Sequence, residues 1–426
     1  MTTSTKSNDE VAAVVRSIAT AARDASHALA TADNDTRNKA LSDAATSIRN
    51  HAEELKQENA KDMAFGQEKG LNEAMLDRLA LDDARIESMA TGLETVAALP
   101  DPLGKILGEW DRPNGLNFSR VSVPLGVIGI IYESRPNVTA DSGGLCLKSG
   151  NAAVLRGGSE SLHSSSKIAE CLQQGLKSAG LPDTAIQLIP TRARAAVGEM
   201  LKAVGLIDII VPRGGQSLTE RVMTESKVPT LAHLIGNCHI YVHRDANAEM
   251  ARQVITNAKL RRPGICGAVE SLLVDRDVAA KILPALVNDL TAGGCAIRGD
   301  AESQAIDKRI DQATEEDWSA EYLDKIISVK LVDGVEEAVT HINRYGSNHT
   351  EAIITENDEA AEQFFHGIDS GIVLHNASTQ FADGGEFGMG AEIGIATGKL
   401  HARGPVGAEQ LTIYKYLVRG SGQIRP

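Results

Sequence analysis

The sequence predicts an α/β protein with two doubly wound α/β domains and a β-arm for oligomerisation. Its 426 residues are too many for one ordinary core. Three further observations support this fold class. A long helical pattern opens the chain, strand and helix patterns then alternate in two separate series, and a hairpin pattern and a late strand pattern lie outside both series.

Residues 9–99 carry the helical pattern. They are rich in Ala, Leu and charged residues, and the first proline is Pro100. Apolar residues recur at helical spacing, for example between Leu41 and Ile48. We expect three or four amphipathic helices here, with a break around Gly66–Gly70, and no residues that take part in chemistry.

Two strand patterns outside the main series predict the arm. Trp110–Leu116 is rich in turn residues and lies between two short strand patterns, as in a β-hairpin. Leu411–Val418 predicts one more strand, which would be an exposed edge on a monomer. We therefore assign residues 106–124 and 406–426 to an arm that reaches another subunit, in a homodimer or higher homo-oligomer.

The first alternating series begins with the apolar run Val127–Tyr132, which predicts a buried parallel strand. Strands and helices alternate from there to Val211, so ligands are expected at the carboxyl ends of a doubly wound sheet. Two strand ends, at Gly157–Ser159 and Gly214–Gly215, can admit phosphates closely, although such turns more often have no ligand. The dinucleotide fingerprint Gly-x-Gly-x-x-Gly is absent.

The second series starts near His233–Val242. A helix over Asn247–Lys259 and a strand over Val269–Val274 follow, and the alternation continues to Asn376. The glycine-rich tract Phe381–Gly407 has no long apolar run, which predicts a looped segment that lines a cleft.

One cysteine, Cys266, lies where the helix of the second series gives way to the strand. It follows Arg261, Arg262 and a Pro-Gly pair, so the sulfur is expected at a turn with backbone N–H groups and positive charge nearby. Such surroundings lower a thiol pKa and favour the nucleophilic thiolate. The alternative is a buried, inert cysteine.

Composition excludes several classes of protein. The net charge is 43 − 57 = −14, which disfavours general binding to nucleic acid or anionic membrane. No apolar stretch is long enough to span a membrane, and the first residues lack a signal-peptide pattern. Five widely spaced cysteines without a Cys-x-x-Cys pair argue against structural zinc or a disulfide framework, and for a reducing, cytoplasmic setting.

Together these motifs resemble the aldehyde dehydrogenase superfamily and, within it, the γ-glutamyl phosphate reductases, also called glutamate-5-semialdehyde dehydrogenases. The resemblance covers essentially the whole chain. Its most specific markers are Pro124–Thr139, Lys148–Ser159, Val211–Gly215, Gly236–Val242, Arg262–Cys266 and Leu400–Gly407.

The resemblance implies an activity and a division of the chain. The activity is NADPH-dependent reduction of L-glutamate 5-phosphate to L-glutamate 5-semialdehyde, with release of phosphate through a cysteine thioester, in proline biosynthesis. Residues 1–105 and 125–235 would form the cofactor-binding domain, and residues 236–405 the catalytic domain. Two alternatives stay open: a hydrolysing or CoA-acylating aldehyde dehydrogenase, and an inactive α/β scaffold or binding module.

The family pattern makes Cys266 the nucleophile and Asn137 the side chain that stabilises the oxyanion, with a turn-forming role as the alternative for Asn137. His233 occupies the position of the glutamate that activates water in hydrolytic relatives, which favours phosphate over water as the acyl acceptor. The alternative for His233 is a packed, hydrogen-bonded histidine. One departure is Gly267, where the family commonly has asparagine.

For the cofactor, hydrolytic relatives have Lys-x-x-Glu where this chain has Arg156-Gly157-Gly158-Ser159. Loss of the carboxylate and gain of an arginine favour NADP over NAD. Glu321 matches the glutamate that binds the nicotinamide ribose, with a surface glutamate as the alternative. The substrate phosphate and α-carboxylate need cationic partners, for which the candidates are Arg135, Arg262 and Arg403, although each is equally compatible with a structural ion pair. No metal is expected.

Overall fold

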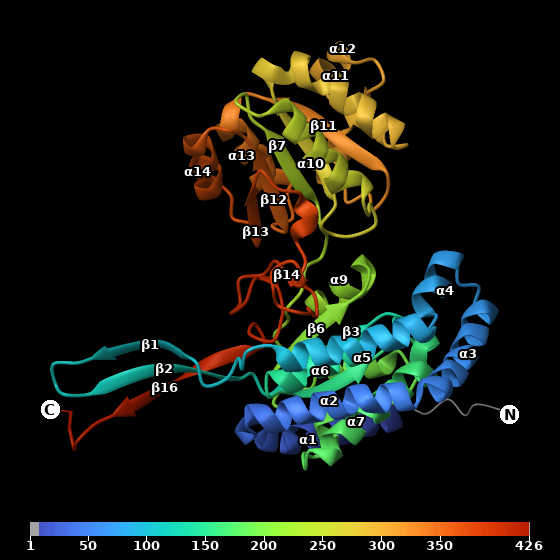
Figure 1. The fold of residues 1–426 in the computed structure, drawn as a ribbon, viewed down its shortest axis with the longest axis vertical. Coiled ribbons are helices and arrows are strands. Elements are labelled where there is room, and N and C mark those ends of the chain that lie inside the picture. Colours follow the sequence, from blue (N-terminus) through green and yellow to red (C-terminus); the bar gives the residue numbers. More distant parts are fainter. Residues whose placement is uncertain (1–7, 426) are drawn as a thin grey trace.

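The computed structural model describes residues 8–425 and shows two α/β lobes stacked end to end, with a thin arm projecting from the first lobe (Figure 1). The first lobe contains the N-terminal helices and a four-stranded sheet, and the second contains a seven-stranded sheet. This arrangement confirms the predicted fold class.

Five helices precede the first strand. They are amphipathic, and three of them begin at short polar side chains: Asp33, Asn72 and Asp82 each accept a hydrogen bond from a backbone N–H three residues on. The predicted break at Gly66–Gly70 lies slightly later, because the third helix continues through Gly66, whose missing side chain makes room for Leu79. Their bounds are α1 Asn8–Thr31, α2 Asn34–Asn50, α3 Ala52–Glu68, α4 Glu73–Leu79 and α5 Asp83–Ala98.

The four-stranded sheet is parallel, in the order β5-β4-β3-β6. The chain moves outward from β3 to β4 and β5, then returns to the other side of β3, so the switch point lies between β3 and β6. Its elements are β3 Val127–Tyr132, α6 Asn137–Lys148, β4 Ala152–Arg156, α7 Leu162–Ser178, β5 Ile186–Leu188, α8 Ala195–Leu201, β6 Ile209–Arg213 and α9 Gln216–Glu225.

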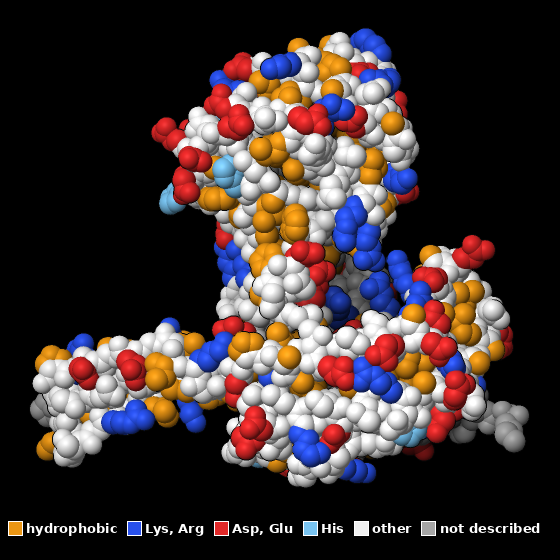
Figure 2. All heavy atoms as spheres, viewed as in Figure 1, with side chains coloured by type: hydrophobic (Ala, Val, Ile, Leu, Met, Phe, Trp, Pro, Cys, Tyr) orange, Lys and Arg blue, Asp and Glu red, His pale blue; other side chains and the backbone are white. Residues whose placement is uncertain are grey.

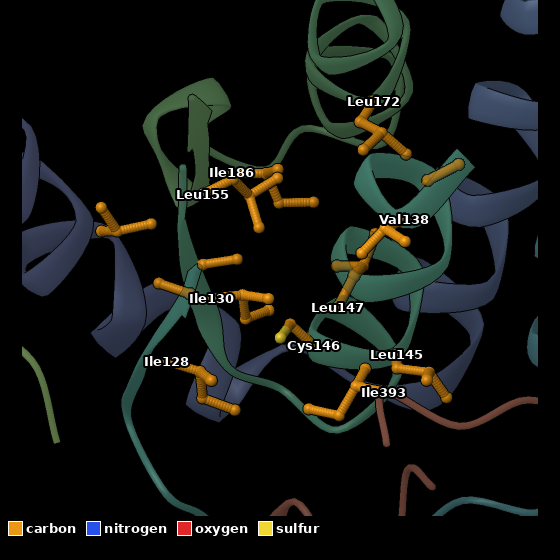
Figure 3. Close-up of a cluster of buried hydrophobic side chains, with 14 of the residues drawn as sticks. Ile128, Ile130, Val138, Leu145, Cys146, Leu147, Leu155, Leu172, Ile186 and Ile393 are labelled. Carbon is orange, nitrogen blue, oxygen red and sulfur yellow. The ribbon is translucent and has the colours of Figure 1, made fainter. Parts of the chain in front are cut away.

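The core of this lobe lies between the sheet and its helices. Figure 3 shows Ile128 and Ile130 of β3 facing Leu145 and Leu147 of α6, with Cys146 among them. Both faces of β3 are covered, which explains why its sequence is uniformly apolar.

The seven-stranded sheet of the second lobe is also parallel, in the order β10-β9-β11-β8-β7-β12-β13. The predicted alternation is confirmed throughout. The strands are β7 Cys238–Val242, β8 Val269–Asp275, β9 Ala296–Gly299, β10 Asp311–Gln312, β11 Ile326–Val332, β12 Thr350–Ile354 and β13 Ile372–His375. The helices are α10 Ala248–Leu260, α11 Arg276–Ala292, α12 Ala301–Ile306, α13 Gly334–Tyr345 and α14 Asp358–Gly367.

The arm is a three-stranded antiparallel sheet of β1 Ile106–Asp111, β2 Asn117–Pro124 and β16 Thr412–Arg419. The predicted hairpin and late strand are therefore confirmed. β16 pairs with β2 of its own chain, which leaves β1 and β16 as the two edges of the arm within this chain.

The glycine-rich tract returns the chain to the first lobe. It is largely irregular, with the short strands β14 Ile395–Ala396 and β15 Gly404–Pro405. Ile393, Ala396 and Val406 are buried in the core of the first lobe. The second-domain range 236–405 therefore ends too late, because these apolar side chains pack with the first lobe.

Candidate active site

Cys266 lies in the turn between α10 and β8, at the amino edge of the seven-stranded sheet. His233, Glu321 and His349 precede β7, β11 and β12, so they belong to the same edge. This edge faces the first lobe, and the tract that crosses back between the lobes contributes Ile395, which packs against Cys266. These four residues thus lie at amino ends of strands, as the sequence predicted for Cys266, whereas the carboxyl ends named in the sequence analysis belong to the sheet of the first lobe.

Gly236 lies directly against the turn that contains Cys266 and helps to fix its position. A Cβ built on residue 236 would lie 2.7 Å from the Cβ of Cys266, so a side chain here would displace the cysteine. The Gly236 N–H donates to Glu321 Oε1 at 2.9 Å, and the Cys238 thiol donates to the carbonyl oxygen of Cys266 at 3.0 Å. The turn is therefore held from the segment before β7.

The pKa of the Cys266 thiol is raised, whereas the sequence predicted that its surroundings lower it. Burial and, to a smaller extent, the carboxylates of Glu321 and Glu392 raise the pKa of Cys266 to about 12, while Arg213 partly opposes them. The predicted lowering is wrong, because burial and the two carboxylates outweigh the positive charge near the sulfur.

Two carboxylates lie close to Cys266, and each is bound to a backbone N–H. Glu321 accepts from Gly236, and Glu392 Oε2 accepts from the N–H of Gly384 at 2.9 Å. Burial raises the pKa of both acids. Glu392 was not identified from the sequence; its position in the glycine-rich tract predicted to line a cleft was the only signal.

His233 lies beside Cys266 and is oriented by the returning tract. Its Nδ1 lies 2.7 Å from the carbonyl oxygen of Ile395, and its ring meets the ring of His349 edge to face at 5.1 Å. Burial lowers the pKa of His233, so the neutral imidazole is favoured. His233 is therefore a packed, hydrogen-bonded histidine that also borders the nucleophile.

Asn137 is the first residue of α6 and is exposed. Its amide donates to Asp141 Oδ2 at 3.1 Å, and among the described residues no hydrogen bond joins it to Cys266. Burial raises the pKa of Asp141 to about 6. An oxyanion role would require the Asn137 amide to turn away from Asp141.

Arg135 and Arg213 lie at the carboxyl ends of β3 and β6, at the switch point of the four-stranded sheet, and Arg78 and Arg262 are near enough to act on Arg135; these four residues are called the arginine cluster. Burial lowers the pKa of Arg135 and repulsion from the other three arginines lowers it further, while Glu133 opposes them. Figure 2 shows Lys and Arg side chains gathered in the hollow between the lobes. Such an excess of positive charge suits an anionic ligand.

Arg213 was missed in the sequence, although it lies within the marker Val211–Gly215. It ends β6 and is near enough to influence the pKa of Cys266, of His233 and of Glu392. Arg403, by contrast, has its guanidinium bonded to the Asp369 carboxylate at 2.6 Å and to the carbonyl of Thr397 at 3.2 Å. It forms the structural ion pair that the sequence left as its alternative.

The loop after β4 approaches β3 closely. A Cβ on Gly158 would lie 2.7 Å from the backbone nitrogen of Ser134, so only glycine fits. The Ser159 hydroxyl donates to Glu160 Oε1 at 2.5 Å, and Ser134 donates to the other Glu160 oxygen at 2.6 Å. This loop therefore still carries a carboxylate, that of Glu160, one residue after Ser159. The serine at position 159 did not by itself indicate this.

Arg156 ends β4 and is buried, with its guanidinium near Arg194 and Arg221. It donates to the carbonyl of Gly157 at 2.6 Å, but its Nε has no partner. Burial lowers the Arg156 pKa; the Glu160 carboxylate opposes this effect, and Arg194 and Arg221 add to it. A buried guanidinium whose Nε has no partner among the described residues fits an anionic group such as a cofactor phosphate.

Gly214 and Gly215 lie between β6 and α9. The Gly215 N–H donates to Glu133 Oε1 at 2.7 Å, and the first residues of the ten-residue helix are exposed. An exposed helix N-terminus at a switch point is a favourable position for a pyrophosphate. The carboxyl edge of the first sheet thus offers cofactor contacts opposite the cysteine.

Comparisons with known proteins agree with this geometry. The aldehyde dehydrogenase family model matches residues 2–301. The chain is 58% identical over 418 residues to γ-glutamyl phosphate reductase of Rhodospirillum rubrum, covering 98% of each chain. It is 56% identical over 426 residues to that of Brucella anthropi, covering 100% of each. The chain belongs to the γ-glutamyl phosphate reductases of the aldehyde dehydrogenase family.

Solved structures place the fold in the same family. The crystal structure of γ-glutamyl phosphate reductase from Thermotoga maritima matches with a TM-score of 0.95 and 42% identity, over 97% of this chain and 100% of that one. An acetylating aldehyde dehydrogenase from Geobacillus thermoglucosidasius shares the fold at a TM-score of 0.68 and 20% identity, over 98% of this chain and 99% of that one. The family predicted from the motifs is confirmed.

Proposed function

We propose that this chain catalyses the NADPH-dependent reduction of L-glutamate 5-phosphate to L-glutamate 5-semialdehyde, with release of phosphate, as a step of proline biosynthesis. The observation that carries the proposal is the position of Cys266, which lies between the two lobes and within the electrostatic reach of Arg213. Near-complete coverage of γ-glutamyl phosphate reductases at 56–58% identity supports the substrate.

In the proposed mechanism the Cys266 sulfur attacks the acyl carbon of the substrate and phosphate leaves, giving a thioester. Deprotonation of the half-buried thiol costs free energy, because its apolar surroundings and two nearby carboxylates disfavour the thiolate. A doubly charged phosphate in the arginine cluster brings the reacting carbon to the sulfur, and positioning of this kind contributes much of the rate.

The oxyanion that forms during attack needs hydrogen-bond donors. The backbone N–H of Cys266 and the amide of Asn137 are the proposed donors, and each is worth roughly 3 kcal/mol in comparable sites. A nicotinamide cofactor held by the first lobe would supply the hydride for the thioester, and Cys266 would then be released as the free thiol together with the semialdehyde.

Hydrolysis of the thioester is disfavoured by the residue at the glutamate position. His233 has its Nδ1 engaged by a carbonyl, and the nearby carboxylates of Glu321 and Glu392 are each bound to a backbone N–H. Neither carboxylate occupies the position of the glutamate that activates water in hydrolytic relatives. Phosphate, held by the arginine cluster, is then the natural acyl acceptor in the reverse reaction.

NADP(H) is the proposed cofactor. The 2′-phosphate would meet Arg156, whose Nε is buried and unpartnered, with Arg194 and Arg221 adding positive charge. The pyrophosphate would lie at Gly214 and Gly215, beside the N-terminus of α9. Gly157, Ser159 and Glu321 remain proposed cofactor contacts, and the bond from Gly236 to Glu321 leaves the second carboxylate oxygen of Glu321 for a ribose hydroxyl.

The division of labour between lobes is also a proposal: residues 1–105 and 125–235 bind cofactor, and the second lobe supplies the thiol. The arm supports a homodimer or higher oligomer, because its exposed side chains include Trp110, Tyr414 and Tyr416. In residues 8–425 no helix is long and apolar enough to cross a membrane. A cytoplasmic location is proposed from the reduced cysteines and the biosynthetic role.

To test the proposal, the protein is assayed for turnover with glutamate semialdehyde and NADP in the presence of phosphate, arsenate, CoA or buffer alone. Strict dependence on phosphate or arsenate supports the proposal, and activity in plain buffer would show a hydrolysing enzyme. Cys266→Ala should abolish turnover while leaving NADP binding intact, and Cys295→Ala, at a buried cysteine in another turn, is the matched control.

A further inference from the structure

Three side chains at the amino edge of the second sheet bring metal-binding atoms together. His233, Cys266 and His349 each offer one ligand atom, and these atoms all lie within 4.8 Å of one another. The three residues precede β7, β8 and β12, which are neighbours in the sheet in the order β8-β7-β12. The order of the strands in the sheet therefore brings these three side chains together.

Both imidazoles have a ring nitrogen available to a ligand. A carbonyl only accepts, so the 2.7 Å contact from Ile395 places the proton of His233 on Nδ1 and leaves the lone pair on Nε2. His349 is fully buried, with Nδ1 2.9 Å from Thr350 Oγ1, and among the described residues its Nε2 has no hydrogen-bond partner. With the proton on Nδ1, this Nε2 also offers a lone pair to a ligand.

We propose that His233, Cys266 and His349 bind a borderline divalent cation, with Zn²⁺ as the best fit, and that the bound ion blocks the nucleophile reversibly. Imidazole and thiolate are the ligands such ions prefer, and a site with three protein ligands keeps one position for water. Bonds of about 2.0–2.3 Å to zinc require ligand atoms about 3.5 Å apart. The three ligand atoms, which now lie within 4.8 Å of one another, would therefore have to draw closer on binding.

The surroundings favour a cation. The carboxylates of Glu321 and Glu392 act on the Cys266 sulfur, and their combined effect is opposed by the charge of Arg213. Cys238 is not a ligand in this arrangement, since its thiol donates to the carbonyl of Cys266. On binding, the Cys266 thiol loses its proton to solvent and a sulfur–zinc bond forms; no electron is transferred.

The inhibitory consequence rests on the proposed role of Cys266 as nucleophile, but the binding does not. A Cys266 that binds zinc without affecting turnover would leave the metal site standing and remove the proposed mechanism. Binding is therefore measured separately from activity, on the full chain.

The experiment titrates the protein with Zn²⁺ against a chromophoric chelator, and with Co²⁺, whose thiolate complexes show a charge-transfer absorption. We expect one ion per chain, a cobalt–thiolate band, and protection of Cys266 from iodoacetamide by zinc that is reversed by chelator. His233→Gln and His349→Gln should each weaken zinc binding by at least about tenfold. Cys295→Ser and His163→Gln, which lie outside the trio, should leave the affinity unchanged.

Three results would overturn the proposal. They are absence of the cobalt–thiolate band, unprotected alkylation of Cys266 at saturating zinc, and unchanged zinc affinity in His233→Gln. The first two use the unmodified chain, so they test the site even if His349→Gln, at a fully buried position, fails to fold.

Discussion

Gly236 and Cys266 are in direct backbone contact, so close that a Cβ on residue 236 would lie 2.8 Å from the Cα of the cysteine. The glycine also donates to Glu321. One residue thus sets the position of the proposed nucleophile and of the proposed ribose-binding acid.

Gly236→Ala should displace the cysteine turn and lower kcat/KM by about 100-fold, as misplacement of a reacting group by about 1 Å does in other enzymes. Steady-state kinetics and thermal unfolding measure the effect and show whether the fold is retained. Gly264→Ala is the matched control, because its Cβ would meet nothing nearer than the Leu323 carbonyl at 3.7 Å. Equal activity in the two variants would contradict the proposed constraint.

The raised pKa of Cys266 predicts how the free thiol reacts. With a folded-state pKa of about 12, above the ordinary thiol value of about 8.5, the thiolate fraction increases tenfold per pH unit across the neutral range. Alkylation of Cys266 by iodoacetamide, followed by mass spectrometry in the presence of a chelator, should keep rising from about pH 7 to about pH 9.5. A plateau near the ordinary thiol pKa would refute burial as the controlling effect.

Substitution of Arg213 should weaken the use of substrate, whereas substitution of Arg403 should not. Arg213→Gln removes a positive charge that acts on Cys266, and loss of a charge-assisted contact of about 1.5–3 kcal/mol lowers kcat/KM by roughly 10- to 100-fold. Arg403→Gln should lower the melting temperature and leave KM nearly unchanged, since Asp369 already binds its guanidinium. The reverse pattern would make Arg403 the substrate-binding arginine.

Arg156→Gln tests the cofactor assignment. If Arg156 binds the 2′-phosphate, the ratio of kcat/KM with NADP to that with NAD should fall by roughly tenfold or more, because only NADP carries that group. The two cofactors are compared in one preparation, so a general loss of folded protein cancels. An equal decrease with both would assign Arg156 a structural role.

Negative charges introduced on the two edge strands of the arm should oppose association between copies of this chain. Ile106 on β1 is 61% exposed and Val418 on β16 is 49% exposed, so aspartate at both positions costs the monomer little and discourages edge pairing. Sedimentation velocity should show a shift to monomer for the double variant. Val204→Asp, at a 64% exposed position outside the arm, should sediment like the unmodified chain.

Sequence periodicity predicted the sheets well because buried parallel strands have an unmistakable pattern. β3 spans the predicted Val127–Tyr132, and the arm hairpin is also where its turn residues indicate. The N-terminal helices number five in the described chain rather than three or four, because short connections between helices carry little turn signal.

Much of the site could not be read from the chain, because it depends on contacts between distant segments. The Cys266 pKa is set by burial and by Glu321 and Glu392, which lie far from the cysteine along the chain. Arg213 and His349 became recognisable only when the sheet order brought their loops together. Local sequence reports the two arginines next to Cys266 but not which groups face its sulfur.

The path of the chain between the lobes has a consequence for biosynthesis of the protein itself. The second lobe is a contiguous insertion, whereas the first core is completed only by Ile393, Val406 and Leu411. During translation the inserted lobe can therefore fold as a unit while the helices made earlier wait with part of their apolar surface uncovered. Chaperone capture of ribosome-bound chains should be strongest in the interval before these late side chains emerge.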